Sequence, residues 1–178
     1  GAPLLGEHGP EILAARRPAR LAESSGALGE AVGAARDAGL LPLSGMRVAN
    51  FGWGLVGPMV GQLLSFLSAE VYKIESSAQL DFQRKVPPFY HGIPHPDRSI
   101  QNHACWAGNG SVSLNLKQPE AKRLALELIA QADVVIENFG PGVMGQLGLG
   151  YARRREVKHD LVMFSMPATA TMSPAVAD

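Results

Sequence analysis

The stretch Pro42–Glu75 constrains the fold more than any other part of the chain. A short, mostly apolar run at Met46–Phe51 is followed by closely spaced glycines and then by an apolar segment that reaches Leu67. A second run of strand-forming residues, Val71–Ile74, ends in Glu75. This order predicts a strand, a glycine turn, a helix and a second strand, which together make one βαβ unit. A parallel sheet with a right-handed crossover follows from that unit.

The glycines of this stretch, Gly52, Gly54 and Gly57, suit a sharp turn from a strand into a helix, because glycine tolerates backbone angles that other residues avoid. Pro58 fits the first helical position, where no amide proton is missed. The free N–H groups at the start of that helix favour an anion. The turn is therefore a candidate binding site for a phosphate or a flat ligand.

Two interpretations of this turn are open at this point. The segment from Gly52 to Gly57 matches the G-x-G-x-x-G pattern of dinucleotide-binding proteins, and Glu75 stands where such proteins place the acid that binds ribose. Pro58 argues against this interpretation, because a dinucleotide fold packs a tight helical turn at that position. The alternative is a glycine turn that serves backbone geometry alone.

Strand-like runs alternate with helical ones along the rest of the chain. The segment Pro119–Ala130 places its apolar residues on one face of a 3.6-residue repeat, which predicts a helix. We therefore predict an α/β fold, a Rossmann-like open parallel sheet flanked by helices. Its strands are expected at Arg47–Phe51, Val71–Ile74, Val112–Leu116, Val134–Ile136 and Leu161–Ser165.

Composition narrows the function classes. Of the 178 residues 46% are hydrophobic and 18% are charged, which is typical of a globular chain. Because 16 basic residues balance 16 acidic ones, no overall field favours nucleic acid or an anionic membrane as a partner. Cys105 is the single cysteine, so no intrachain disulfide can form and a cytoplasmic location is expected. No apolar run has the length of a transmembrane helix.

The stretch 77–110 shows no clear period, and unstructured stretches of this length inside a domain are often functional. It contains metal-binding residue types at His91, His95, Asp97, His103 and Cys105. Their spacing matches no zinc pattern, so we expect polar loop residues and no metal site.

Several blocks of sequence, in order and in register, resemble the family III CoA transferases. The first is PLSG-x-RV-x-x-F-G-x-x-x-x-GP, which begins at Pro42 and is followed by AEV-x-KIE up to Glu75. The others are SVSLNLKQPEA at Ser111–Ala121, ADVVIENFGPGVM at Ala132–Met144, LGLGY at Leu147–Tyr151 and DLVMFS at Asp160–Ser165. The family includes formyl-CoA transferase, carnitine CoA-transferase and the related alpha-methylacyl-CoA racemase.

The resemblance also implies a domain organisation. The segment LGEHGPEIL near the start of the chain resembles the closing segment of the same family, so residues 1–15 are expected to be the tail of a preceding family domain. Residues 16–40 then form a linker, and 41–178 the N-terminal part of a family III domain, an incomplete fragment of a larger interlocked-dimer fold. A tandem parent chain and a homodimer of the full-length protein are the corresponding expectations.

A CoA site at the carboxyl edge of the sheet is implied by the same resemblance. The expected contacts follow three strands and are Trp53, Leu55 and Val56, then Leu114 and Lys117, then Asn138 and Phe139. Phe139 is expected to stack on the adenine and Asn138 to form a hydrogen bond with it. Lys117 and Lys73 are the nearby cations for phosphate.

The reaction class that the resemblance implies is acyl-CoA chemistry, with an acyl-CoA and a carboxylic acid as partners. In the transferases an aspartate attacks the thioester carbonyl and forms an acyl-enzyme anhydride, whereas in the racemase a His and an Asp move the α-proton. That aspartate is expected beyond Asp178, so no catalytic residue is assigned and the chain alone is expected to be inactive. Ser76 stands where the family often has a polar or cationic residue, and Gln146 stands where formyl-CoA transferase has an arginine. These departures leave the acid substrate open.

Two alternatives to a CoA transferase remain at the level of sequence. One is the Rossmann domain of an NAD(P)-dependent oxidoreductase, which depends on the glycine pattern and Glu75. The other is a non-catalytic, degraded copy that keeps the fold.

Overall fold

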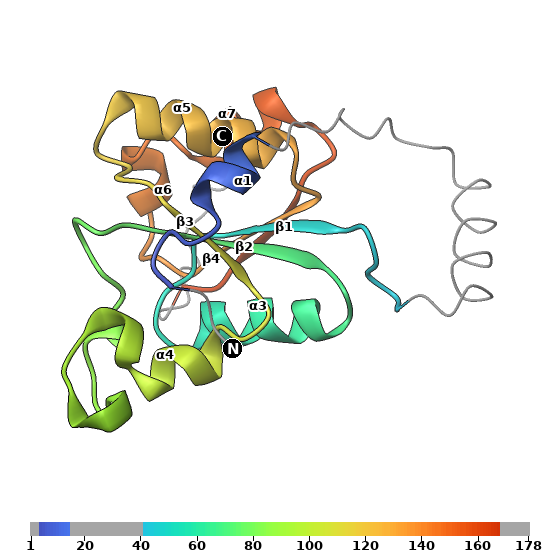
Figure 1. Ribbon diagram of the computed structural model, residues 1–178. Coiled ribbons are helices and arrows are strands. Elements are labelled where there is room, and N and C mark those ends of the chain that lie inside the picture. The colour runs from blue at the N-terminus through green and yellow to red at the C-terminus, as the bar shows by residue number, and fades with distance from the viewer. Residues whose placement is uncertain (1–3, 15–40, 168–178) are drawn as a thin grey trace.

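The computed structural model describes residues 4–14 and 41–167. Within this part of the chain the strands form one five-stranded sheet in the order β3-β2-β1-β4-β5, and all four pairings are parallel (Figure 1). The strands are β1 (Arg47–Asn50), β2 (Glu70–Glu75), β3 (Gly110–Ser113), β4 (Val134–Glu137) and β5 (Val162–Ser165). The predicted Rossmann-like α/β fold is thus confirmed, and the carboxyl ends of all five strands lie at one edge.

Helices cover both faces of this sheet (Figure 1). On one face lie α3 (Val56–Phe66) and α4 (Ile100–Cys105), and on the other lie α1 (Gly9–Ala14), α5 (Pro119–Ala130), α6 (Val143–Gln146) and α7 (Tyr151–Val157). Three 3-10 turns occupy the connection from β2 towards β3, at η1 (Phe82–Arg84), η2 (Tyr90–Gly92) and η3 (Pro96–Arg98). None of the helices in these two ranges is long and apolar enough to cross a lipid bilayer.

Each face of the sheet has its own hydrophobic core. On one face the apolar stripe of α5, which includes Ala125 and Ile129, packs against inward-facing residues such as Val112 and Val135. On the other face Val48, Val71 and Ile136 form a smaller cluster with partly buried residues of α3. The near-continuous apolar runs of the strands therefore reflect burial on both faces, as expected for parallel strands.

The outer edge of β3 is covered by the N-terminal segment Leu4–Ala14. The Gly6 amide donates to Ser111 Oγ at 2.8 Å, and the His8 amide donates to the Ser111 carbonyl oxygen at 3.0 Å. Ile12 then packs against the larger core. Covering an edge strand in this way removes a template for pairing with other chains.

The structure differs from the sequence prediction mainly in the connection between β2 and β3. The stretch 77–110 contains η1, η2, η3 and α4, and no periodic pattern in the sequence predicts them. β3 ends at Ser113 rather than Leu116, because the chain turns at Asn115, whose carbonyl oxygen accepts the Gln118 amide at 2.8 Å. The linker expected at 16–40 lies outside the described residues.

Candidate functional site

A cavity of about 260 Å³ opens at the carboxyl edge of the sheet. Its walls are mostly apolar, and the residues come from the ends of four strands. They include Phe51 and Trp53 after β1, Glu75 and Ser76 at β2, Leu114 and Lys117 after β3, and Phe139 after β4. This carboxyl edge is where open α/β sheets bind ligands, so the cavity is the candidate site.

Four of the seven predicted contact residues line this cavity, and three do not. Trp53, Leu114, Lys117 and Phe139 form part of its wall. Leu55 and Val56 lie at the start of α3, outside the lining, and remain 54% and 51% exposed. Asn138 also lies outside the lining, for a reason that its hydrogen bonds make clear.

Both ends of the Asn138 amide are bonded to the backbone of Trp53. The Trp53 N–H donates to Asn138 Oδ1 at 2.7 Å, and Asn138 Nδ2 donates to the Trp53 carbonyl oxygen at 2.8 Å. The indole of Trp53 then meets Phe139 edge to face, with ring centroids 5.9 Å apart. Asn138 thus holds the aromatic wall of the cavity in place.

The glycine turn is packed too tightly for larger residues. A Cβ on Gly57 would lie 2.5 Å from Gly52 Cα, so the two glycines touch across the turn. Beneath them Asn50 accepts the Gly52 amide through Oδ1 at 2.8 Å and donates to the Gly57 carbonyl oxygen at 2.9 Å. Gly54 has φ +68°, a left-handed conformation that glycine adopts without strain.

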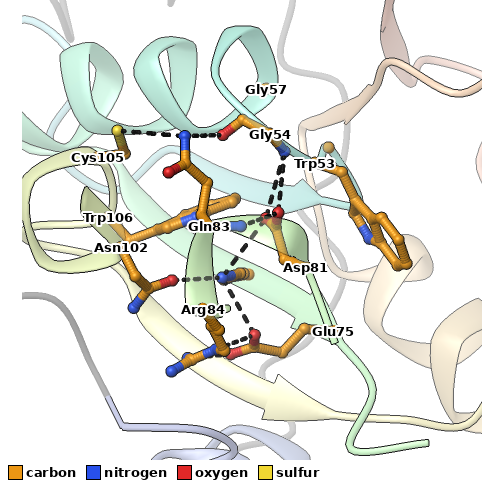
Figure 2. A network of polar contacts seen from close by, with 12 residues as sticks. Trp53, Gly54, Gly57, Glu75, Asp81, Gln83, Arg84, Asn102, Cys105 and Trp106 are labelled. Atoms are coloured by element: carbon orange, nitrogen blue, oxygen red, sulfur yellow. Dashed lines mark hydrogen bonds and ion pairs between the residues drawn. The ribbon is translucent and has the colours of Figure 1, made fainter. Parts of the chain in front are cut away.

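A network of buried charges lies under the turn (Figure 2). Arg84 donates to both carboxylate oxygens of Glu75 at 2.7 Å, and Lys73 Nζ lies 3.1 Å from Glu75 Oε2. Ser111 Oγ adds a third donor to Glu75 at 2.6 Å. All of these side chains are almost completely buried, so the charges are paired within the protein interior rather than solvated.

Lys73 connects this ion pair to a second set of polar groups. Its Nζ donates to Asn102 Oδ1 at 3.2 Å, lies 3.9 Å from Asp81 Oδ2 and lies 4.2 Å from the centre of the Trp106 ring. Because Lys73 is completely buried by these partners, the prediction that it supplies positive charge for phosphate is wrong. Lys117, which is exposed at the cavity, remains the cation there.

Burial and pairing shift the titration of three members of the network. Desolvation lowers the pKa of Lys73 despite the nearby Glu75 charge. Burial alone would raise the pKa of Glu75, but the Arg84 hydrogen bonds and the Lys73 charge outweigh it and lower that pKa. For Asp81 burial prevails and raises the pKa, although Lys73 and two backbone amides oppose it. Glu75 is therefore held as a carboxylate, whereas the charge of Asp81 is less well compensated.

The metal-binding residue types of the 77–110 stretch serve other purposes where the structure describes them. Asp97 accepts a hydrogen bond from Arg84 Nη1 at 2.9 Å, and His103 Nε2 lies 2.8 Å from the Asp97 carbonyl oxygen. Across residues 4–14 and 41–167 no group of three or more His, Cys, Asp or Glu side chains is placed to hold a metal ion.

Comparison with known proteins gives a consistent result. The model of the CoA-transferase family III matches residues 43–175. The chain is 37% identical over 131 residues to CoA-transferase/lyase DddD of Marinomonas sp., covering 74% of this chain and 14% of that protein. It is 35% identical over 135 residues to succinate–glutarate CoA-transferase of Agrobacterium fabrum, covering 75% of this chain and 34% of that protein.

Solved structures agree with the sequence relatives. A CAIB/BAIF family protein from Brucella suis matches with a TM-score of 0.64 and 36% identity, over 70% of this chain and 33% of that one. Rv3272 from Mycobacterium tuberculosis matches with a TM-score of 0.65 and 34% identity, over 76% and 37%. The chain thus spans about a third or less of the length of the relatives named here.

Proposed function

The chain belongs to the CoA-transferase family III, and from that premise we propose that it forms the CoA-binding part of an enzyme that moves CoA between an acyl-CoA thioester and a carboxylic acid. The observation that carries this proposal is the cavity at the carboxyl edge. Four of the residues that are expected to contact CoA line this cavity. Its apolar wall suits the adenine or the pantetheine chain, and Lys117 at its rim suits a phosphate.

The structure favours CoA over a dinucleotide as the ligand. In a dinucleotide site the acid after the second strand must accept hydrogen bonds from ribose. Here both oxygens of Glu75 are already bonded to Arg84, and Lys73 and Ser111 donate to the same carboxylate. Glu75 is therefore engaged in the protein interior, which removes the main support for an NAD(P)-dependent oxidoreductase.

A covalent acyl-enzyme step needs a free carboxylate at the thioester. The attacking oxygen forms an anhydride with the acyl carbon, the C–S bond breaks and CoA leaves as the thiolate. Glu75 is the only acid among the residues lining the described cavity, and its bonds to Arg84 exclude that role. We therefore propose that the nucleophile lies outside the residues described. As a separate proposal from the family, the enzyme works as a homodimer in the cytoplasm.

The binding experiment is a calorimetric titration of the 178-residue chain with CoA and, separately, with NAD. CoA is expected to bind and NAD is not. Phe139→Ala is expected to weaken CoA binding by roughly 1–3 kcal/mol, the scale of base–aromatic stacking. The matched control is Phe66→Ala, an exposed phenylalanine on α3 that does not line the cavity. Binding of NAD in place of CoA would refute the proposal, and an unchanged affinity of Phe139→Ala would remove that residue from the site.

The turnover experiment tests the location of the nucleophile. The chain is incubated with an acyl-CoA and a free acid such as oxalate or carnitine, and exchange of CoA is followed by chromatography. No exchange above background is expected. Exchange that is lost on substitution of Asp160 or Asp178 would show that the nucleophile lies within this chain.

A further inference from the structure

The backbone of Trp53 and Gly54 is held entirely by side chains from two distant parts of the chain. Asn138 occupies the N–H and the carbonyl oxygen of Trp53. The carboxylate of Asp81 accepts the Gly54 N–H at 3.2 and 3.3 Å from its two oxygens, and Gln83 Nε2 donates to the Gly54 carbonyl oxygen at 3.1 Å (Figure 2). Four consecutive backbone polar groups of the turn therefore have side-chain partners.

Asp81 is the most deeply buried member of this set. It is completely buried, its Oδ1 also accepts the Gln83 amide at 3.1 Å, and Lys73 Nζ lies 3.9 Å from its Oδ2. Lys73 is itself fixed by Glu75 and Asn102. The carboxylate thus connects the rigid end of β2 to the turn that follows β1.

The turn needs such a partner because its conformation leaves few alternatives. Gly54 has φ +68°, and a Cβ at this position would lie 2.7 Å from Phe82 Cε1. The η1 segment, which contains Phe82, therefore packs directly against the turn. A buried N–H without an acceptor would be costly. Any displacement of Gly54 would be passed to Trp53, the neighbouring residue, whose indole forms the wall of the cavity.

We propose that Asp81 is a positioning residue for the CoA site: it holds the Gly54 amide and thereby sets the Trp53 wall, with Gln83 and Asn138 completing the arrangement. This inference rests on the proposed function, since CoA is the ligand whose binding the wall serves. Asp81 does not line the cavity. Its effect on binding passes through the turn.

The test compares Asp81→Ala with Asp81→Asn, using Asp133→Ala as the matched control. Alanine removes the acceptor for the Gly54 amide, whereas the asparagine carbonyl oxygen can keep it. Asp133 also accepts a backbone amide, that of Arg47 at 2.9 Å, but it lies at the opposite edge of the sheet. Two quantities are measured on the 178-residue chain, the hydrogen-exchange rate of the Gly54 amide without ligand and the affinity for CoA.

Asp81→Ala is expected to speed exchange of the Gly54 amide and to weaken CoA binding by about tenfold or more, since small displacements of a site are strongly felt. Asp81→Asn is expected to restore most of both properties, and Asp133→Ala to change neither. A purely structural role would lower the unfolding midpoint of both Asp81 variants without separating alanine from asparagine at this amide. If Asp81→Ala does not fold, Asp81→Ser replaces it, because the serine hydroxyl is too short to reach Gly54.

The outcomes separate this inference from the proposed function. Unchanged exchange at Gly54 in the alanine variant, or unchanged CoA affinity despite faster exchange, overturns the role of Asp81. Failure of the unsubstituted chain to bind CoA overturns the proposed function and, with it, positioning for CoA, even where the exchange rates respond as expected. Faster exchange together with weaker binding, both restored by asparagine, supports the inference.

Discussion

Arg84 and Arg154 are both almost completely buried, at 1% and 3% exposure, yet their surroundings are opposite. Arg84 lies on the β2–β3 side of the sheet and donates to Glu75 and Asp97. Arg154 lies on α7, near the charge of Glu137 at the end of β4, and neither its Nε nor its Nη1 has a hydrogen-bond partner among the residues described. The Arg84 guanidinium is thus hydrogen-bonded to carboxylates, whereas the burial of Arg154 is opposed by the nearby Glu137 charge without a hydrogen bond at these two nitrogens.

The two sides of the sheet differ in the same sense at their edges. β3 is covered by the segment Leu4–Ala14, whose Leu5 amide donates to Asp97 at 3.0 Å and so joins the Arg84 network. On the other side β5 leaves Val162 and Phe164 55% and 50% exposed. The comparison teaches that the Arg84 guanidinium is matched by carboxylates, on what we call the compensated side of the sheet. On the uncompensated side, around β5, Arg154 has two buried guanidinium nitrogens without a hydrogen-bond partner among the residues described.

Removing Arg84 from the compensated side should have the largest effect on the free energy of unfolding. Arg84→Met leaves the Glu75 and Asp97 carboxylates without their strongest partner, and removing one member of a buried ion pair costs about 3–5 kcal/mol. The free energy of unfolding, measured by urea denaturation, is expected to fall by that amount. Arg123→Met is the control, because Arg123 also pairs with two glutamates but is exposed on α5. A loss at Arg84 no greater than the one at Arg123 would show that the network does not stabilise the fold.

The sequence predicted the frame of the compensated side but not its contacts. The alternation of strand-like and helical runs was sufficient to predict five parallel strands, and the rule for open α/β sheets placed the site at their carboxyl edge. The position of Lys73 near that edge suggests a contact with phosphate. Its position two residues before Glu75 on a strand buried on both faces would have indicated an internal ion pair instead, since residues i and i+2 share a face.

The partners of Asp81 and Asn138 could not be predicted in the same way. Asp81 reaches a backbone amide 27 positions earlier, and Asn138 reaches one 85 positions earlier. Such contacts depend on where an aperiodic loop settles, and no repeat in the stretch 77–110 encodes that. The predicted role of Asn138 as a direct ligand of adenine stays a prediction, and the structure offers its bonds to Trp53 as the competing use of the same amide.

On the uncompensated side, removing the buried arginine should raise the free energy of unfolding, whereas on the compensated side it lowers it. Desolvation lowers the pKa of Arg154, while the nearby Glu137 charge opposes that effect. Arg154→Met keeps most of the side-chain volume and removes buried polar atoms that lack partners, so the free energy of unfolding is expected to rise by roughly 1–3 kcal/mol. The control is Arg153→Met at the neighbouring exposed position, which should leave the urea midpoint unchanged. A loss of stability in Arg154→Met would mean that the guanidinium has a partner in solution, and the contrast with Arg84 would disappear.

The smallest expected effect is on the stability in acid, and it separates the contributions of Glu75 and Asp81 on the compensated side. The pKa of Glu75 is lowered in the folded state, so its stabilising contribution is complete above the ordinary glutamate pKa of 4.5 and is lost as the pH falls through the folded value. The pKa of Asp81 is raised above its ordinary 3.8, so protonation of Asp81 begins first and stabilises the folded state over the same range. The two contributions therefore oppose each other as acid is added.

Asp81→Asn removes the opposing contribution and leaves that of Glu75. As the pH falls from neutral through the ordinary Glu and Asp pKa values of 4.5 and 3.8, the variant is expected to lose more of its free energy of unfolding than the unsubstituted chain does. Urea denaturation at a series of pH values measures both curves, and Asp133→Asn provides the same chemical change at the far edge of the sheet. If the Asp81→Asn curve were parallel to that of the unsubstituted chain, folding would not shift the pKa of Asp81, and the distinction between a fully paired Glu75 and a less well compensated Asp81 would not hold.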